Sequence, residues 1–263
     1  MIWRQLKVRP FESKMSHIHN VSEARTQYLE NPFNNLTFLL NKRYKWMEDF
    51  IKADSKTIEL GSGAGFSQLF IKNKIFMTDV NKNKWIEEVI DLNNISDSSI
   101  SSQQIIISHT IHHLANPYKF LKDIGKKMES GQYLIIQEIY TSIFCKFLLY
   151  LKRHEGWDEN KNIYNLNEVM NDIDDPWSAN CSIPKLLFKN EKEFENNVSD
   201  FKIIHKKYSE VLIFPLSGGV TAKTKIPKLP TGFLKLLDSL DTLLTNLFPN
   251  MFACGISVVL EKK

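Results

Sequence analysis

The chain has 263 residues, 34 lysines and arginines against 30 aspartates and glutamates, and a formal net charge of +4. So small a charge, without a block of basic residues, gives no reason to expect a nucleic-acid partner. The three cysteines lie far apart and have no C-x-x-C spacing, so they indicate neither a disulfide framework nor a zinc site. The length suits one α/β domain with insertions.

The sequence contains no apolar stretch long enough to cross a membrane. Residues 1–7 lack the apolar core of a signal peptide. We therefore expect a cytoplasmic protein, for which peripheral contact with a membrane surface stays open.

The first part of the chain predicts an arm and a helix. Residues 1–33 mix basic, aromatic and polar residues without a clear period, and we interpret them as an arm or lid that packs on the domain. Asn34 or Asn35 can cap the next segment, in which apolar residues recur at helical spacing. These apolar residues are Leu36, Leu39, Leu40, Met47, Phe50 and Ile51. The polar cluster at 42–45 falls mostly on the opposite side, so we expect it to face solvent.

Residues 56–70 predict a strand, a tight turn and a helix. An apolar run ends at Leu60, and three glycines follow at every second position: Gly61, Gly63 and Gly65. Glycine lets the backbone take positive φ and lets a ligand approach main-chain N–H groups at the start of a helix. A purely structural turn is the alternative.

An acidic residue follows the glycine turn at the distance typical of nucleotide-binding domains. Asp79 ends a second apolar run about twenty residues after the turn, where it can accept hydrogen bonds from both hydroxyls of a ribose. The dinucleotide fingerprint needs its third glycine at the sixth motif position, but Phe66 stands there and the third glycine, Gly65, comes one position earlier. The spacing of the glycines therefore argues against NAD as the ligand, and NAD is kept only as the less favoured alternative.

The middle of the chain alternates strands with helices. Residues 104–108 form a strand of the buried type, and Asn116 and Pro117 supply the cap and first turn of a helix that runs to Met128. Residues 131–138 form the fifth strand. This alternation predicts a parallel, doubly wound sheet with an active crevice at the carboxyl ends of its strands. Five polar residues lie near such ends: Glu59, Asp79, Asp91, His109 and Glu138.

The last part of the chain predicts a cover for the crevice and two further strands. Residues 139–200 are too long for a simple crossover and rich in Asn, Asp and aromatic residues, so we interpret them as an insertion that covers the crevice. Strands are expected at 201–214 and 254–260. The amphipathic helix expected at 233–247 is most simply explained by packing against the core.

The E-x-G-x-G-x-G form of residues 59–65 resembles motif I of the class I S-adenosylmethionine (SAM) dependent methyltransferases. His112-His113, Gly131 and Glu138 are similar to the type 11 group of that class. The chain departs from the commoner pattern at Ser130, where a second glycine usually precedes the fifth strand. Four further segments resemble a bacterial subgroup associated with polysaccharide or glycolipid biosynthesis: 152–155, 175–180, 183–188 and 214–219.

The resemblance implies a Rossmann-like, seven-stranded α/β sheet whose last strand is antiparallel, and SAM as the cofactor. In the family the glycine loop wraps the methionine end of the cofactor. An acidic residue at the place of Asp91 approaches the adenine amino group, and Leu92 fits the place of a residue that packs on the ring. The implied cofactor-binding residues are Glu59, Gly61, Ser62, Gly63, Gly65, Asp79, Val80, Asp91, Leu92 and His109.

Methyl transfer from a sulfonium is an in-line displacement in which the protein aligns the reactants, so no metal is expected. A hydroxyl acceptor needs a base, and histidine is suited to that role. His154 in the insertion is the first candidate, because Glu155 follows it and can orient the ring. His113 is the second, because the end of strand four faces the methyl group in this fold. A surface position for His154 and a packing role for His113 are the alternatives.

We expect O-methylation of a sugar, or of a glycolipid or polysaccharide precursor, by a monomer or homodimer. N-methylation of a small metabolite or RNA is the alternative among enzymes, and the absence of N-P-P-Y at a strand end and of a basic patch counts against it. A SAM-binding regulatory module without catalysis is the alternative outside enzymes. The intact acidic positions argue against that module.

Overall fold

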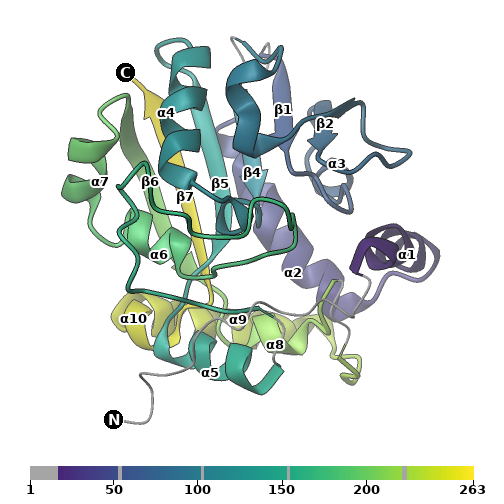
Figure 1. Ribbon diagram of the computed structural model, residues 1–263. Helices are drawn as coiled ribbons and strands as arrows, with labels where there is room; N and C mark the ends of the chain where they lie inside the picture. Colours follow the sequence, from purple (N-terminus) through teal and green to yellow (C-terminus); the bar gives the residue numbers. More distant parts are fainter. Residues whose placement is uncertain (1–16, 53–54, 102–103, 153–154, 221–223) are drawn as a thin grey trace.

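The computed structural model describes residues 17–52, 55–101, 104–152, 155–220 and 224–263, with the backbone alone for residues 17–20. A seven-stranded sheet in the order β3-β2-β1-β4-β5-β7-β6 runs through the middle of the molecule, with helices on both faces (Figure 1). The strands are β1 (Thr57–Leu60), β2 (Ile75–Asp79), β3 (Glu88–Val89), β4 (Gln104–Ser108), β5 (Tyr133–Ile139), β6 (Phe201–Ser209) and β7 (Gly255–Lys262).

The strand directions confirm the predicted architecture. Strands β1 to β5 pair in parallel, and β7 is antiparallel to both β5 and β6. Strand β7 lies between β5 and β6, so the edge of the sheet is β6. The strand expected at 201–214 ends earlier, at Ser209, because Glu210 takes a left-handed backbone conformation with a φ of 63° that no extended strand can contain.

Helices connect the strands and cover the sheet. The first half of the chain holds α1 (His17–Glu30), α2 (Asn34–Tyr44), the 3₁₀ turn η1 (Lys45–Asp49), α3 (Ser67–Phe70), η2 (Leu92–Asp97), η3 (Ile111–His113) and α4 (Pro117–Lys127). The second half holds α5 (Ile143–Lys152), α6 (Ile183–Phe188), α7 (Glu191–Asn197), α8 (Ile213–Leu216), α9 (Thr231–Leu247) and α10 (Pro249–Phe252).

The central strand β4 explains why the sheet is doubly wound. Its three isoleucines are completely buried and do not alternate with polar residues, as expected for a parallel strand covered on both faces. Ile105 and Ile107 pack in one cluster with Leu121 of α4, whereas Ile106 packs in a second cluster with Leu40 of α2. Successive residues of one strand therefore support two separate helical layers.

The start of α4 follows the prediction, but the start of α2 does not. The Asn116 side chain accepts a hydrogen bond from the N–H of Lys119, and Pro117 occupies the first turn of α4. The expected capping of α2 by Asn34 or Asn35 is wrong, because Phe33 occupies the cap position. Asn35 is buried within the helix, and its amide joins α2 to main-chain atoms of residues 216, 227 and 229.

The expectation that residues 42–45 face solvent is also wrong for the middle pair. Arg43 and Tyr44 are buried. The Arg43 guanidinium donates two hydrogen bonds to the Glu210 carboxylate, with nitrogen–oxygen distances of 2.9 and 2.6 Å. The partner lies 167 residues further along the chain, which no local pattern reveals.

Helix α9 is only half buried, so core packing does not account for the whole of it. Its inner side buries Leu234, Asp241 and Thr245. Its outer side exposes an apolar stripe formed by Phe233, Leu236, Leu240, Leu243 and Leu247, each between 42% and 65% exposed. Helix α10 contacts both α9 and α5, and α5 exposes Ile143, Phe147, Tyr150 and Leu151. Within the described residues, no helix is both long and apolar enough to cross a membrane.

Candidate functional site

The glycine turn after β1 leaves one side of the backbone open. Gly61, Gly63 and Gly65 have φ values of 71°, 50° and 62°. A Cβ on Gly61 would lie 2.4 Å from the Thr110 side chain, and one on Gly65 would lie 2.6 Å from Trp85. Around Gly63, by contrast, no described atom lies within 4 Å of such a Cβ. Two glycines therefore permit close packing of the turn, and the third faces free space.

Asp79 holds this turn from the neighbouring strand. Its carboxylate accepts hydrogen bonds from the N–H groups of Gly63 and Asn81, each at 2.9 Å. Burial raises the pKa of Asp79, and the backbone donors oppose that effect. A carboxylate has about four acceptor positions, so Asp79 can accept further hydrogen bonds from a ligand.

A cavity of about 150 Å³ lies beside Gly63 and Asp79. Its lining includes two carboxylates, from Asp79 and Asp91, and the apolar side chains of Ile90, Leu92 and Leu114. The Asp91 side chain also caps η2 by accepting a hydrogen bond from the N–H of Asn93. Pro176 and Trp177 of the insertion complete the lining.

A larger cavity of about 280 Å³ adjoins the first and shares its lining at Gly61, Gly63, His109, His113 and Trp177. Its other polar lining residues include Arg43, Tyr44, Ser108, His112, Lys152 and Glu155. Its apolar lining residues include Leu39, Leu40, Leu148, Leu149, Phe214 and Val220. The two cavities thus share walls and lie beside residues that follow the carboxyl ends of β1, β2 and β4.

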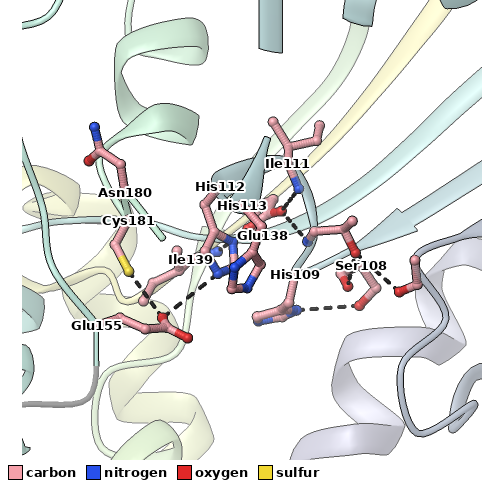
Figure 2. Close-up of polar contacts among 12 residues, drawn as sticks. Ser108, His109, Ile111, His112, His113, Glu138, Ile139, Glu155, Asn180 and Cys181 are labelled. Atoms are coloured by element: carbon pink, nitrogen blue, oxygen red, sulfur yellow. Dashed lines mark hydrogen bonds and ion pairs between the residues drawn. The ribbon is translucent and has the colours of Figure 1, made fainter. Parts of the chain in front are cut away.

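A buried carboxylate fixes the loop after β4 (Figure 2). Glu138, at the end of β5, accepts hydrogen bonds from the N–H groups of Thr110 and Ile111, each at 2.7 Å. Its other oxygen lies 2.6 Å from Nδ1 of His112, and since a carboxylate only accepts, Nδ1 carries the hydrogen. Burial alone lowers the pKa of His112, but the charges of Glu138 and Glu155 outweigh it and raise the pKa to about 9.

His113 lies beside His112 in η3, but its imidazole is neutral whereas that of His112 is positively charged. Its Nδ1 donates to the Ser178 carbonyl oxygen at 3.1 Å, which leaves Nε2 as the nitrogen with a lone pair. Burial and the positive charge of His112 lower the pKa of His113 to about 4. His113 is therefore a neutral imidazole that lines both cavities.

The insertion holds both histidines in place. The His112 carbonyl accepts hydrogen bonds from the Asn171 amide at 2.8 Å and from the N–H of Asn180 at 2.9 Å. Glu155 approaches from the same segment, with a carboxylate oxygen 3.7 Å from Nε2 of His112 (Figure 2). The Cys181 thiol donates to that oxygen at 3.1 Å.

Most of the sequence-predicted cofactor residues line these cavities: Gly61, Ser62, Gly63, Asp79, Val80, Asp91, Leu92 and His109. Glu59 and Gly65 do not. Glu59 is buried beneath the turn, where its carboxylate accepts a hydrogen bond from the Ser67 hydroxyl at 2.6 Å. Of the predicted catalytic residues, His113 and Glu155 line the larger cavity, and His154 lies outside the described residues.

Several side chains around His112 and His113 could not be identified from the sequence. His112 was noticed only as part of a family motif, although Glu138 at the next strand end was a signal that a carboxylate would reach it. Arg43, Tyr44 and Ser108 gave no signal, because their place in the cavity depends on contacts between distant parts of the chain.

No family model matches the chain, and no curated protein matches it. Among solved structures, the chain is similar to a SAM-dependent methyltransferase from Archaeoglobus fulgidus, with 17% identity, a TM-score of 0.51, and coverage of 86% of this chain and 94% of that one. It is also similar to a SAM-dependent methyltransferase from Anabaena variabilis (14% identity, TM-score 0.46, 93% and 94% coverage). A third similar structure is the plantazolicin methyltransferase BpumL bound to S-adenosylhomocysteine (14%, 0.46, 95% and 92%).

The first of these likenesses and the sheet order together define the fold. The chain has the Rossmann-like fold of the class I SAM-dependent methyltransferases, with seven strands and the last one antiparallel.

Proposed function

We propose that the protein is a SAM-dependent methyltransferase that methylates a hydroxyl group of a sugar, or of a glycolipid or polysaccharide precursor. The observation that carries this proposal is the pair of adjoining cavities that share Gly61 and Gly63, one lined by two carboxylates and apolar side chains and both lined by the neutral imidazole of His113. The fold of the chain agrees with this use.

The smaller cavity fits the nucleoside half of SAM. Asp79 retains acceptor positions for the ribose hydroxyls, and Asp91 can accept from the adenine amino group. Leu92, with Ile90 and Leu114, supplies an apolar surface for the ring. The open space before Gly63, which any side chain would fill, is suited to the methionine end. Bound SAM would supply the electrophilic methyl group.

The larger cavity suits an acceptor with both apolar and polar parts. Leucines from α2 and α5 form much of its wall, and Lys152 and Glu155 offer charged groups to a polar end. The outer side of α5 is apolar and exposed, so one helix borders both the acceptor cavity and the exposed apolar face. This arrangement favours an acceptor that has a lipid part and is reached from a membrane surface.

His113 is our proposal for the group that takes the acceptor proton. Its Nδ1 is engaged by the Ser178 carbonyl, so Nε2 is available to accept a proton in the cavity. Glu155, in the same cluster, can stabilise the imidazolium that forms. His154 precedes Glu155 in the chain and is kept as the competing base.

Two segments are proposed to enclose the site. Residues 139–200 supply Trp177 and Glu155 to the cavities. The arm at 1–33 includes α1, in which Arg25 donates hydrogen bonds to the carbonyl oxygens of Ala64 and Gly65. The main domain then comprises residues 34–263. We further propose a cytoplasmic monomer or homodimer.

The test of this function has two stages. Calorimetry with S-adenosylhomocysteine should give binding at one site per chain, whereas NAD should give none. Turnover is then measured as formation of S-adenosylhomocysteine from SAM with pools of sugars and of lipid-linked sugars, and the product is identified by mass spectrometry. NAD binding without S-adenosylhomocysteine binding would overturn the cofactor. A methylated amine as the sole product would overturn O-methylation.

A further inference from the structure

Three side chains on the wall of the larger cavity have the arrangement of a metal site. One ring nitrogen each of His112 and His113 and a carboxylate oxygen of Glu155 all lie within 4.8 Å of one another. We propose that these three residues bind a divalent transition-metal ion of the zinc class, and that the bound ion blocks His113 as a proton acceptor. The cysteine spacing and the chemistry of methyl transfer gave no reason to expect a metal, and neither of them bears on a pair of histidines with a glutamate.

The hydrogen bonds behind the two histidines support ligation. Metal-binding histidines usually donate their second ring N–H to a carboxylate or a carbonyl, which fixes the ring and its tautomer. His112 donates Nδ1–H to Glu138 at 2.6 Å, and His113 donates Nδ1–H to the Ser178 carbonyl at 3.1 Å. His113 thus keeps the lone pair of Nε2 for an ion, whereas the positively charged His112 must release the proton on its Nε2 to solvent before that nitrogen can bind one.

The distances are close to those that a metal requires. Ligand atoms about 2.1 Å from a tetrahedral zinc ion lie roughly 3.4 Å apart. Nε2 of His112 is 3.7 Å from the nearer oxygen of Glu155, and the two imidazole rings have centroids 4.2 Å apart. Small side-chain rotations would close the site around an ion.

The donor set and the charge decide which ion fits. Two imidazoles and one carboxylate suit zinc, cobalt or nickel, whereas magnesium and calcium prefer oxygen ligands throughout. Glu138 and Glu155 both lie against His112, so the surroundings favour a positive charge at the centre. A fourth position would face the cavity, where a water molecule can bind.

The inhibitory half of this proposal rests on the proposed function, but the binding half does not. A nitrogen lone pair that is bonded to a metal ion cannot accept a proton. If His113 takes the acceptor proton, an ion in this site removes the base and narrows the cavity. Binding of the cofactor should be preserved, because of the three proposed ligands His113 alone also lines the smaller cavity.

Binding is tested with cobalt, whose visible absorption reports its ligands. Co²⁺ alone is titrated into the metal-stripped full chain, and we expect one equivalent to give a spectrum that Zn²⁺ abolishes. Glu155→Gln and His113→Ala should each weaken binding at least tenfold. The control is His205→Ala, which removes an imidazole that stacks on Trp46 on another part of the sheet. Circular dichroism checks that each variant is folded. If His113→Ala is unfolded, Glu155→Gln alone provides the test.

The effect on function is measured separately. Added Zn²⁺ should abolish SAM turnover by the native chain, and calorimetry should find the affinity for S-adenosylhomocysteine unchanged within twofold. A cobalt spectrum that is absent, or equally strong in Glu155→Gln, would overturn the site. Turnover that rises with metal would overturn the inhibitory role. Cobalt binding in a chain that never turns over SAM would leave the site standing and reject the proposed function.

Discussion

The Asp79 carboxylate accepts a hydrogen bond from the glycine turn at Gly63, so the loss of this carboxylate should weaken cofactor binding. We expect Asp79→Ala to weaken binding of S-adenosylhomocysteine by about 1–3 kcal/mol, the range for hydrogen bonds to a charged group. Calorimetry provides the measurement, and Asp172→Ala, in the insertion, is the matched control. An unchanged dissociation constant would mean that the ribose binds elsewhere.

Glu59 should make the stability of the protein depend on pH. Burial raises the pKa of this carboxyl from about 4.5 to about 7, while hydrogen bonds from Ser67 and Ser62 act in the opposite direction. The folded state therefore binds the proton more tightly than the unfolded state. The resulting stabilisation is complete below pH 4.5 and is lost as the pH rises through 7, by about 3 kcal/mol in all.

Glu59→Gln should remove this decline, because a glutamine has no proton to lose. Urea unfolding of the native chain and of the variant at pH 5, 6, 7 and 8 measures the difference. We expect the free energy of unfolding of the native chain to fall more steeply with pH than that of the variant. Parallel profiles would show that Glu59 ionises in the folded protein as easily as in the unfolded one.

The choice between the two candidate bases is decided by a pair of substitutions. We expect His113→Ala to lower kcat on the order of a hundredfold, because general-base catalysis typically contributes that much or more. His154→Ala should have the smaller effect on kcat, with unchanged affinity for S-adenosylhomocysteine. Single-turnover kinetics on both variants checks the order. If His154→Ala causes the larger loss, the base is His154.

At the scale of elements, the stripe on the outer side of α9 is suited to a lipid surface. Asp238 and Asp241 are the acidic residues of this fully described helix; Asp238 pairs with Lys42, and Asp241 is buried. Exposed Lys225, Lys228 and Lys235 lie on or just before the helix. The helix therefore combines an exposed apolar stripe with nearby exposed lysines, a combination that complements an anionic bilayer.

We expect the protein to bind vesicles that contain phosphatidylglycerol more tightly than vesicles of phosphatidylcholine alone. Replacing Leu236 and Leu243 by serine should weaken this binding at least tenfold, because each buried leucine contributes about 1.5–3 kcal/mol. The matched control is Leu166→Ser, at an exposed leucine of the insertion. Vesicle sedimentation gives the result. Self-association without vesicle binding would assign the stripe to a second copy of the chain.

An element could be predicted from the sequence where residues close to it in the chain determine its structure. The apolar run Ile105–Ile107 predicts a buried strand, and Asn116 predicts the start of a helix, in both cases from neighbouring residues alone. The spacing from Gly61 to Asp79 predicted in the same way that these residues lie together, and both line the smaller cavity. In the larger cavity the sequence predicted His113 and Glu155 but not Arg43, which is held there by its contact with Glu210, 167 residues further along the chain.

At the scale of the whole molecule, one buried ion pair joins the beginning of the fold to its end. Arg43 of α2 and Glu210 after β6 are both buried and form a bidentate pair. Removing one partner leaves an uncompensated buried charge, so Arg43→Met should lower the free energy of unfolding by about 3–5 kcal/mol. Arg43→Met combined with Glu210→Met should recover most of that loss. Urea unfolding measures the free energy of unfolding of both variants. Equal losses would mean that lost packing, rather than an unpaired buried charge, destabilises the protein.

The insertion that forms the wall of the acceptor cavity also holds the backbone of His112 through Asn171 and Asn180. The segment that fixes this backbone therefore also lines both cavities. Replacing residues 139–200 with a segment from a known methyltransferase, in order to change the acceptor, would also remove the amides that hold the turn with both histidines. On the proposed function, such a chimaera should lose turnover until amides equivalent to these two are restored, and its cofactor affinity should fall as well, because Pro176 and Trp177 line the smaller cavity.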